Sequence, residues 1–315
     1  MTQPLALIFP GQGSQQIGML RELAERYSVV RTTFEEAADA LGYDLWKVVQ
    51  EGPVEQLNAT ACTQPALLAS SVAIARVWQE MEGPRPGAMA GHSLGEYSAM
   101  VCAGVLSFAD GVRLVRLRGE AMQEAVPEGE GAMAAILGLE DAAVEEACAK
   151  AANGDVVAAV NYNAPGQVVI AGAKAAVERA IAACQEAGAK RAMPLPVSVP
   201  SHCALMRPAA ERLSEALDAI ELRAPRYSVV QNVDAQAHAD IGTLRTRLVE
   251  QLYQPVRWVS CVEAMVNSGA EVFIECGPGK VLTGLNKRIA KGSRGLAVND
   301  PDSLIAALEL ARETL

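Results

Sequence analysis

The residues best suited to chemistry lie in the segment GHSLG at 91–95, a G-x-S-x-G pattern. It joins a predicted strand at 87–92 to a predicted helix from about 95 to 103. A serine on so sharp a strand-to-helix turn projects its hydroxyl clear of the sheet, and the flanking glycines let strand and helix approach closely. The helix N-terminus offers unpaired N–H groups to an oxyanion. We therefore predict that Ser93 is a nucleophile. The alternative is a serine that merely caps a helix after a Gly-rich turn.

A serine hydroxyl needs a positioned base before it can act as a nucleophile, and the chain has three histidines. His92 adjoins the serine, so its side chain should diverge from it and support the turn. His238 lies in the polar stretch DAQAHAD and is most simply a surface residue. His202, in VPSHCALM before a predicted helix, is left as the base by elimination. Cys203 beside it has no comparable turn and is interpreted as a small buried residue.

The group that orients His202 is not evident from the residues alone. Hydrolases of the α/β type place an Asp or Glu at a strand end between the serine and the histidine. The carboxylates between 93 and 202 lie on predicted helices or turns instead. Either a backbone carbonyl orients the histidine, or one strand has been misassigned.

The elements that position these residues alternate between short apolar and longer amphipathic segments, which is typical of an α/β fold. Strands are predicted at 5–9, 87–92, 227–233, 271–276 and 295–299. Helices are predicted at about 17–26, 31–41, 64–81, 95–103, 109–124, 205–220, 243–253 and 257–268, and GPGKV at 277–281 predicts a tight strand-to-helix turn.

A different order of elements occupies residues 128–197. Strands are predicted at 131–139, 156–160, 167–172 and about 190–197, with helices at 140–152 and 173–187. This β-α-β-β-α-β order is that of a ferredoxin-like unit. We therefore expect a discontinuous catalytic domain of residues 1–127 and 198–315 with a parallel sheet, and a small ferredoxin-like subdomain inserted at 128–197.

Composition excludes several classes of function. The chain has 315 residues, half of them hydrophobic, which is enough for a large core. A net charge of −10 argues against nucleic acid or an anionic membrane as the main partner. The seven cysteines are scattered without CxxC spacing, as expected of reduced thiols in the cytoplasm, and no residues show metal-ligand spacing. No apolar run is long enough to span a membrane or to form a signal peptide.

Several ordered motifs carry a resemblance along the whole chain. They are FPGQGSQ (9–15), TQPALLA (63–69), GHSLGEYSA (91–99), RLRGEAMQEAVPEGEGAMAAILGL (116–139), NYNAPGQVVIAG (161–172), PVSVPSH (196–202), EQLYQPVRW (250–258) and GPGKVLTGLNKRI (277–289). In these motifs the chain resembles the malonyl-CoA:acyl carrier protein transacylases of bacterial fatty acid synthesis. So many ordered motifs are far more specific than the serine pentapeptide.

The resemblance implies an α/β-hydrolase-like large domain with a ferredoxin-like insert, and it implies roles for individual residues. Ser93 would be the nucleophile and His202 the base, and the backbone carbonyl of Gln251 would orient the histidine. The backbone N–H groups of Gln12 and Leu94 would form the oxyanion hole. The reaction would transfer malonyl from malonyl-CoA to the phosphopantetheine thiol of a holo acyl carrier protein through a serine ester, with no cofactor and no metal.

The resemblance also assigns Arg118 to the carboxylate of the malonyl group. On spacing alone, this arginine would be one of three solvated cations along a helix, with Arg113 and Arg116. Its match to the motif RGEAMQ favours the binding role. The chemistry agrees, because malonyl differs from acetyl by one carboxylate and the planar guanidinium offers that group two parallel hydrogen bonds.

Three other functions use parts of the same pattern. A serine esterase or thioesterase would explain Ser93 and His202 but leaves Arg118 and the GQGSQ loop without a purpose. A non-catalytic scaffold would not need these three residues intact. A malonyl- or methylmalonyl-selective acyltransferase of polyketide assembly is a near relative, and the length of the chain favours fatty acid synthesis.

Docking of an acidic carrier protein to a chain of net charge −10 requires a local basic patch. The best clustered candidates are Lys190, Arg191, Lys287, Arg288 and Lys291. The alternative is that these cations are merely part of a solvated face.

Overall fold

Two β-sheets organise the molecule, one of five strands and one of four within the residues that the structure describes. The computed structural model describes residues 4–197 and 199–314. The domain limits predicted at residues 1, 198 and 315 fall outside this part of the chain. The division into 1–127 with 198–315, and 128–197, stays a prediction.

The larger sheet is parallel and has the strand order β7-β2-β1-β8-β9. Its strands are β1 (Leu5–Phe9), β2 (Ala88–Gly91), β7 (Ser228–Val230), β8 (Val272–Cys276) and β9 (Arg294–Val298). Central strand β1 is buried along its whole length. Helices cover both faces of such a sheet, so its central strands are continuously apolar, as LALIF is.

Helices pack on both faces of this sheet. They are α1 (Arg21–Arg26), α2 (Ser28–Leu41), α3 (Leu45–Glu51), α4 (Val54–Asn58), α5 (Thr60–Glu80), α6 (Leu94–Cys102), α7 (Phe108–Ala125), α10 (Arg207–Asp218), α11 (Ile241–Glu250), α12 (Trp258–Asn267), α13 (Val281–Ile289) and α14 (Pro301–Glu313), with a 3₁₀ turn at Ala204–Met206. Successive residues of β1 face opposite sides. Leu5 and Leu7 join the core formed with α2, α5 and α7, whereas Ala6 and Ile8 join the core formed with α12 and α13. Within the described residues, no helix is both long and apolar enough to cross a membrane.

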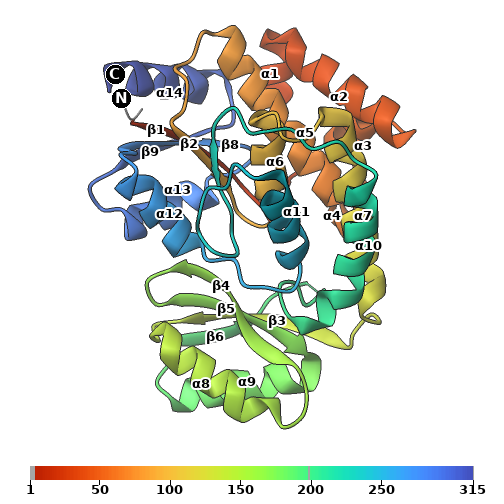
Figure 1. The fold of residues 1–315 in the computed structure, drawn as a ribbon, viewed down its shortest axis with the longest axis vertical. Coiled ribbons are helices and arrows are strands. Elements are labelled where there is room, and N and C mark those ends of the chain that lie inside the picture. The colour runs from red at the N-terminus through yellow and green to blue at the C-terminus, as the bar shows by residue number, and fades with distance from the viewer. Residues whose placement is uncertain (1–3, 198, 315) are drawn as a thin grey trace.

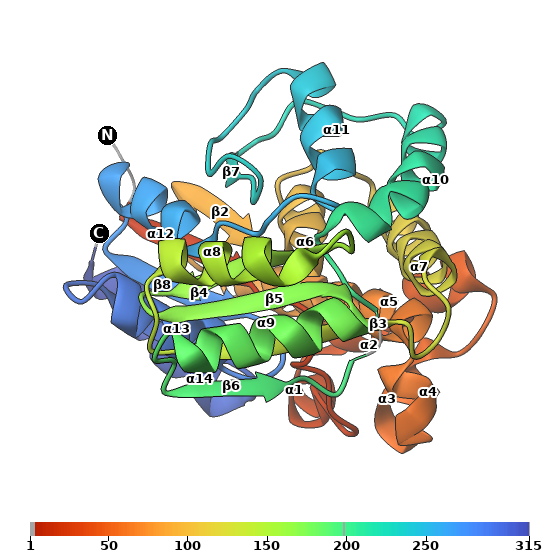
Figure 2. The same cartoon turned by 90° about the horizontal axis from the view of Figure 1, so that it is seen from below.

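The smaller sheet is antiparallel and has the strand order β4-β5-β3-β6. Its elements are β3 (Gly131–Leu137), α8 (Asp141–Ala152), β4 (Val157–Ala164), β5 (Gln167–Ala173), α9 (Lys174–Glu186) and β6 (Arg191–Pro194). Both helices lie on the face of the sheet that points away from the larger sheet (Figures 1 and 2). The predicted α/β fold, with its parallel sheet and small β-α-β-β-α-β unit, is therefore confirmed.

Two parts of the chain differ from the prediction. Strand β6 ends at Pro194, short of the predicted 197. Leu195 still donates its N–H to the carbonyl of Met133 at 2.9 Å, but the next residue, Pro196, has no N–H to donate. Helices α3, α4 and α14 were not predicted. Helix α14 begins at a capping box on Asp300, a signal that the sequence does contain.

The segment between α11 and α12 joins the two sheets. Val256 donates its N–H to the carbonyl of Val160 at 2.8 Å, and Tyr162 donates its N–H to the carbonyl of Val256 at 3.0 Å. The segment therefore lies beside β4 as a short additional strand would. The next residue, Arg257, donates its N–H to the carbonyl of Asn232 at 3.0 Å, so the segment links the small sheet to the residues that follow β7.

Candidate active site

A cavity of about 680 Å³ lies between the carboxyl ends of the parallel strands and the small sheet. Pro10 and Gly11 after β1, and His92 and Ser93 after β2, line it from one side. Met133, Asn161, Asn163 and Val169 of the small sheet, together with Leu195 and Val197, line it from the other. Ligands bind at the carboxyl ends of strands in open α/β sheets, because loops there converge and helices begin there.

Ser93 stands on a strained turn at the start of α6. Its φ of 53° and ψ of −110° lie outside the regions that a side chain normally allows. The turn is possible because its two glycines leave no room for a side chain. A Cβ atom added at Gly91 would lie 1.8 Å from the carbonyl carbon of Gly95, and one at Gly95 would lie 2.0 Å from the carbonyl oxygen of Phe9.

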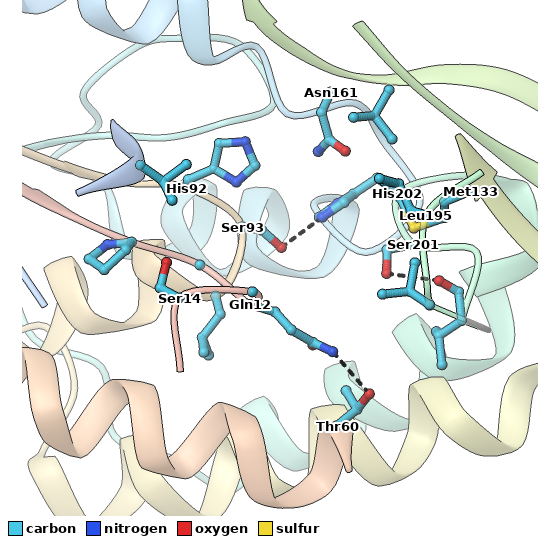
Figure 3. A pocket seen from close by; sticks show the side chains of 18 of the residues that line it. Gln12, Ser14, Thr60, His92, Ser93, Met133, Asn161, Leu195, Ser201 and His202 are labelled. Carbon is cyan, nitrogen blue, oxygen red and sulfur yellow. Dashed lines mark hydrogen bonds between the residues drawn. The ribbon is translucent and has the colours of Figure 1, made fainter. Parts of the chain in front are cut away.

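His202 contacts the hydroxyl of Ser93, with 2.7 Å between Nε2 and Oγ (Figure 3). Its other ring nitrogen, Nδ1, lies 2.6 Å from the main-chain carbonyl oxygen of Gln251. A carbonyl only accepts, so Nδ1 carries the proton and Nε2 presents its lone pair to the serine. Among the described residues, no carboxylate is bonded to His202. A backbone carbonyl thus occupies the place in which hydrolases use an Asp.

Burial changes the proton affinity of this histidine. The ring is 3% exposed. Burial lowers the pKa of His202 to about 3, and the positive charge of Arg118 lowers it further, whereas the hydrogen bond to Gln251 opposes them. The ring is therefore neutral at physiological pH, as a proton acceptor must be.

Gln12 and Leu94, whose main-chain N–H groups are the expected oxyanion hole, line the same cavity as Ser93. Gln12 follows β1, and Leu94 is the first residue of α6. The loop that carries Gln12 runs directly against the turn, since a Cβ atom at Gly11 would lie 2.6 Å from the carbonyl oxygen of His92. Neither N–H donates to a protein acceptor within residues 4–197 and 199–314. Both therefore remain available to a ligand oxygen.

Arg118 on α7 is a buried cation, 1% exposed. Its Nη1 donates to Oε1 of Gln64 at 2.9 Å, and its Nη2 donates to Oε1 of Gln251 at 3.1 Å and to Oγ of Ser93 at 3.3 Å. Its Nε has no hydrogen-bond partner among the described residues, and no carboxylate there lies within ion-pair distance. Burial lowers the pKa of Arg118. The nearby charge of Glu96 opposes that shift, but the guanidinium forms no ion pair with any described carboxylate.

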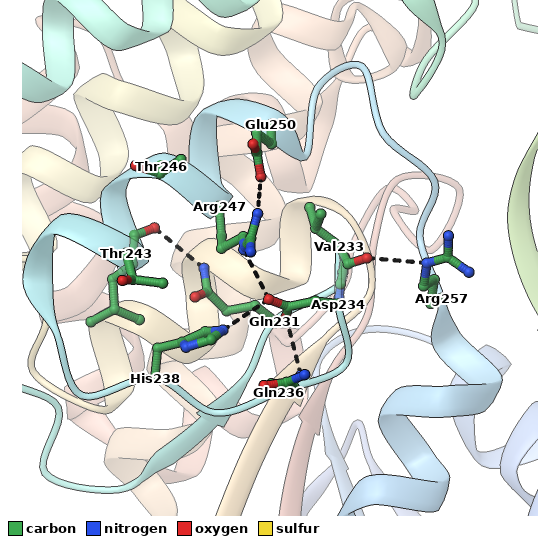
Figure 4. A network of polar contacts seen from close by, with 12 residues as sticks. Gln231, Val233, Asp234, Gln236, His238, Thr243, Thr246, Arg247, Glu250 and Arg257 are labelled. Atoms are coloured by element: carbon green, nitrogen blue, oxygen red, sulfur yellow. Dashed lines mark hydrogen bonds and ion pairs between the residues drawn. The ribbon is translucent and has the colours of Figure 1, made fainter.

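The other two histidines bind elsewhere. Nε2 of His92 lies 2.7 Å from Oδ1 of Asn163 on β4, and burial lowers the pKa of this histidine. His238 was interpreted as a simple surface residue, but it is largely covered and lies 2.9 Å from Oδ2 of Asp234 (Figure 4). Among the three histidines, His202 is thus the one that is bonded to Ser93.

Sequence reasoning missed two residues beneath the turn, Asn232 and Glu96. The Asn232 carboxamide bonds to main-chain atoms on both sides of His92, and the Glu96 carboxylate accepts the main-chain N–H of Asn232 at 2.7 Å. Burial raises the pKa of Glu96 to about 7, and the hydrogen bonds from Asn232 and Gln231 oppose that shift. Two signals were present in the sequence, namely polar residues at the end of a predicted parallel strand and the S-x-x-E spacing from Ser93.

All five candidate docking cations are exposed. Arg288 is already engaged within the protein, however. It donates to Oε1 of Gln167 at 2.5 Å and to the carbonyl of Pro165 at 2.7 Å. This arginine ties α13 to the turn between β4 and β5. The role of the patch in docking stays a prediction.

Neither a metal-binding cluster nor a disulfide occurs among the described residues. No group of three or more His, Cys, Asp or Glu side chains there has the arrangement of a metal site. Each of the seven cysteines is buried and has a free thiol in this part of the chain.

Comparisons with known proteins agree along nearly the whole chain. Residues 6–299 match the family described as acyl transferase domain. The malonyl CoA-acyl carrier protein transacylase of Escherichia coli strain K12 is 60% identical over 310 residues, which cover 98% of this chain and 100% of that protein. The crystal structure of an acyl carrier protein S-malonyltransferase from Vibrio cholerae is 61% identical, has a TM-score of 0.95, and covers 96% of this chain and 99% of its own.

A further solved structure contains a partner. It is a malonyl-transacylase in complex with a holo type II PKS acyl-carrier protein, 58% identical to this chain with a TM-score of 0.96. The match covers 98% of this chain and 100% of the other.

Proposed function

Since this chain belongs to the acyl transferase family, as a malonyl CoA-acyl carrier protein transacylase, we propose which of its residues perform each step of the reaction. The enzyme transfers the malonyl group of malonyl-CoA to the phosphopantetheine thiol of a holo acyl carrier protein. This reaction supplies malonyl-carrier protein for fatty acid biosynthesis. The assignment of the steps rests on the hydrogen bond between Ser93 and His202, with the buried cation of Arg118 beside them.

In the first half-reaction, Nε2 of His202 takes the hydroxyl proton of Ser93 while Oγ attacks the thioester carbonyl carbon. The negative charge develops on the carbonyl oxygen, which accepts hydrogen bonds from the N–H groups of Gln12 and Leu94. The C–S bond then breaks. The thiol of coenzyme A leaves with the proton from His202, and a malonyl ester remains on Ser93.

In the second half-reaction, the thiol of the carrier protein gives its proton to His202, and its sulfur attacks the malonyl ester. The same two N–H groups hold the oxyanion. When the intermediate collapses, Ser93 leaves as an alcohol with the proton from His202, and the malonyl group remains on the carrier. In each half-reaction, Nε2 of His202 thus first accepts a proton and then returns it to the leaving group. The carbonyl of Gln251 keeps the ring in the tautomer that this requires.

The buried charge of Arg118 supports the choice of malonyl over an uncharged acyl group. A guanidinium without an anionic partner in a desolvated site is costly, and a ligand carboxylate removes that cost. An esterase for neutral acyl groups gains nothing from such a residue. We therefore assign Arg118 to the malonyl carboxylate.

The chemistry requires no cofactor, because malonyl-CoA is itself a substrate and each step moves only a proton and an acyl group. We place the enzyme in the cytoplasm, which agrees with its free thiols. The solved complex of a related transacylase makes a polyketide carrier protein a second candidate acceptor.

Intact mass spectrometry tests the proposal. Wild-type enzyme mixed with malonyl-CoA should carry one malonyl group, which peptide mapping places on Ser93, and holo carrier protein should remove it without release of free malonate. Ser93→Ala should carry none, because the substitution removes only the hydroxyl. A malonyl adduct on Ser93→Ala, or release of malonate in place of transfer, would contradict the assignment.

A further inference from the structure

The sequence at the catalytic turn contains a helix-capping motif that the structure does not use. Ser93 to Glu96 has the S-x-x-E spacing of a capping box, in which each side chain accepts the main-chain N–H of the other residue. Ser93 is indeed the N-cap residue of α6, yet its side chain accepts no capping bond. The N–H of Glu96 donates instead to the main-chain carbonyl of Ser93 at 3.1 Å. The hydroxyl is thereby left free to contact His202.

Asn232 takes the place that the glutamate would occupy in a capping box. Its Oδ1 accepts the N–H of Ser93 at 2.8 Å, and its Nδ2 donates to the carbonyl of Gly91 at 2.7 Å. One carboxamide thus bridges the turn from the last residue of β2 to the nucleophile. The orientation of the amide is fixed by chemistry, since a main-chain N–H only donates and a carbonyl only accepts.

Glu96 in turn holds Asn232. Its Oε2 accepts the main-chain N–H of Asn232 at 2.7 Å, and its Oε1 accepts Nε2 of Gln231 at 3.2 Å. All three side chains are fully buried. In a capping box, the Glu96 carboxylate would accept the N–H of Ser93. Here it binds the segment after β7 instead, and Asn232 of that segment accepts the N–H of Ser93.

A second set of polar contacts fixes the same segment to α11 (Figure 4). Asp234, two residues after Asn232, pairs with Arg247 of α11 at 2.8 Å. Helix α11 ends immediately before Gln251, whose Nε2 donates to the carbonyl of Ser93 at 2.9 Å and to Oδ1 of Asn232 at 3.3 Å. Side chains from distant segments therefore bind both main-chain polar groups of Ser93.

We propose that Asn232 is a positioning residue for acyl transfer. Its carboxamide holds the strained main chain of Ser93, so that the hydroxyl points to His202 instead of capping α6, and Glu96 holds Asn232 in place. This inference rests on the proposed role of Ser93 as nucleophile. A positioning role differs from a purely structural one in its effect. Substituting Asn232 should lower the reactivity of Ser93 by more than any loss of folding stability explains.

A fluorophosphonate is a suitable probe, because it reacts with an activated serine and carries no carboxylate for Arg118. Asn232→Ala should lower the second-order rate of phosphonylation and the kcat for malonyl transfer by about 100-fold each, the usual effect of a small misplacement of reacting groups. The KM for malonyl-CoA should change much less than the kcat, because Arg118 keeps both Gln64 and Gln251 as partners and Gln251 loses only its 3.3 Å bond to Asn232.

Asn232→Asp offers a sharper test, which remains usable if Asn232→Ala does not fold. An ionised carboxylate still accepts the N–H of Ser93 but repels the carbonyl of Gly91. A protonated carboxyl has both an acceptor and a donor, as the amide does. We therefore expect phosphonylation by this variant to rise at least about tenfold, relative to wild type, as the pH falls from about 8 to about 5. A relative rate that does not change with pH would overturn the proposal.

Two further variants separate positioning from stability. Glu96→Gln keeps an oxygen that can accept the N–H of Asn232, so it should retain activity within about fivefold, whereas Glu96→Ala should not. Asn286→Ala is the matched control, because Asn286 is a buried asparagine whose carboxamide bonds to Trp258 and not to the turn. It should lower the unfolding temperature without changing the phosphonylation rate of the folded enzyme.

The outcomes are distinguishable from failure of the proposed function. If Ser93→Ala were still phosphonylated in the cavity, the assignment of the nucleophile would be wrong. If Ser93→Ala were inert but Asn232→Ala reacted at the wild-type rate, only the positioning role would be wrong. The same holds if the phosphonylation rate of Asn232→Ala fell no further than that of Asn286→Ala.

Discussion

The main-chain carbonyl oxygen of Gln251 lies 2.6 Å from Nδ1 of His202. Because a carbonyl carries no charge, it orients the ring without stabilising an imidazolium as a carboxylate would. Burial and the charge of Arg118 can therefore lower the pKa of His202 to about 3. The surroundings of His202 therefore keep the base neutral, and the pH dependence of the reaction should reflect this.

The first prediction concerns the acid limb of the pH profile. A histidine of ordinary pKa would lose its base form below about 6.5. Because the pKa of His202 is lowered, the neutral form persists at lower pH, and kcat/KM for malonyl-CoA should show no histidine limb between about pH 7 and 5. The measurement is a pH–rate profile, with Glu96→Gln as the control that removes the other buried acid. A limb near 6.5 in both proteins would show that the base has an ordinary pKa.

The second prediction uses the charge of Arg118 to shift that limb. Its positive charge lowers the pKa of His202, so Arg118→Ala should raise that pKa and move the acid limb to higher pH. Arg118→Lys keeps a cation and should move the limb less. The profile is measured with an acetyl thioester, which does not depend on the arginine for binding. Superimposable limbs in all three proteins would contradict this coupling.

Removing the imidazole tests the base directly. His202→Ala should slow formation of the malonyl-enzyme by roughly 100- to 10,000-fold, the usual contribution of a positioned general base. Raising the pH should restore part of the rate, because serine ionisation is then less limiting. Single-turnover acylation is the measurement. Near-normal acylation would point to His92, although its ring is bonded to Asn163.

Carrier docking is predicted to depend on the exposed basic patch. Reversing the charge of both Lys287 and Lys291 should raise the KM for carrier protein at low salt and weaken its salt dependence, because long-range attraction is lost. Hydrolysis of the malonyl-enzyme should not change. Arg288→Ala is a separate case, since that side chain also ties α13 to the β4–β5 turn. An unaltered carrier KM for the double variant would exclude these two lysines from docking.

The sequence predicted the buried strands well because burial on both faces leaves a continuous apolar run, as in β1 and β8. It overextended the strand at 227–233, since β7 ends at Val230. Gln231 and Asn232 lie just beyond this strand, and both donate hydrogen bonds to Glu96. Helices α3 and α4 are too short for a helical period to be evident.

The pairing of Ser93 with His202, which lie 2.7 Å apart, could be predicted because few side chains in the sequence can carry such chemistry. The carbonyl of Gln251 could not be derived in that way, since every residue has such a group, and it was expected only from the family resemblance. Asn232 was missed because its partners in the turn are about 140 residues away in sequence, a separation that no local pattern reports.

The most direct test of malonyl transfer, as opposed to general serine chemistry, is kcat/KM for malonyl-CoA and acetyl-CoA in wild type, Arg118→Ala and Arg118→Lys. Arg118→Ala leaves the malonyl carboxylate unpaired in a desolvated site, at a cost on the order of 2–5 kcal/mol, or roughly 30- to several-thousand-fold. The proximity of Nη2 to Oγ of Ser93 affects both substrates, so it cancels in their ratio. The malonyl-to-acetyl ratio should collapse in Arg118→Ala and recover only in part in Arg118→Lys, which lacks the planar fork. The same ratio in all three proteins would show that Arg118 does not bind the carboxylate.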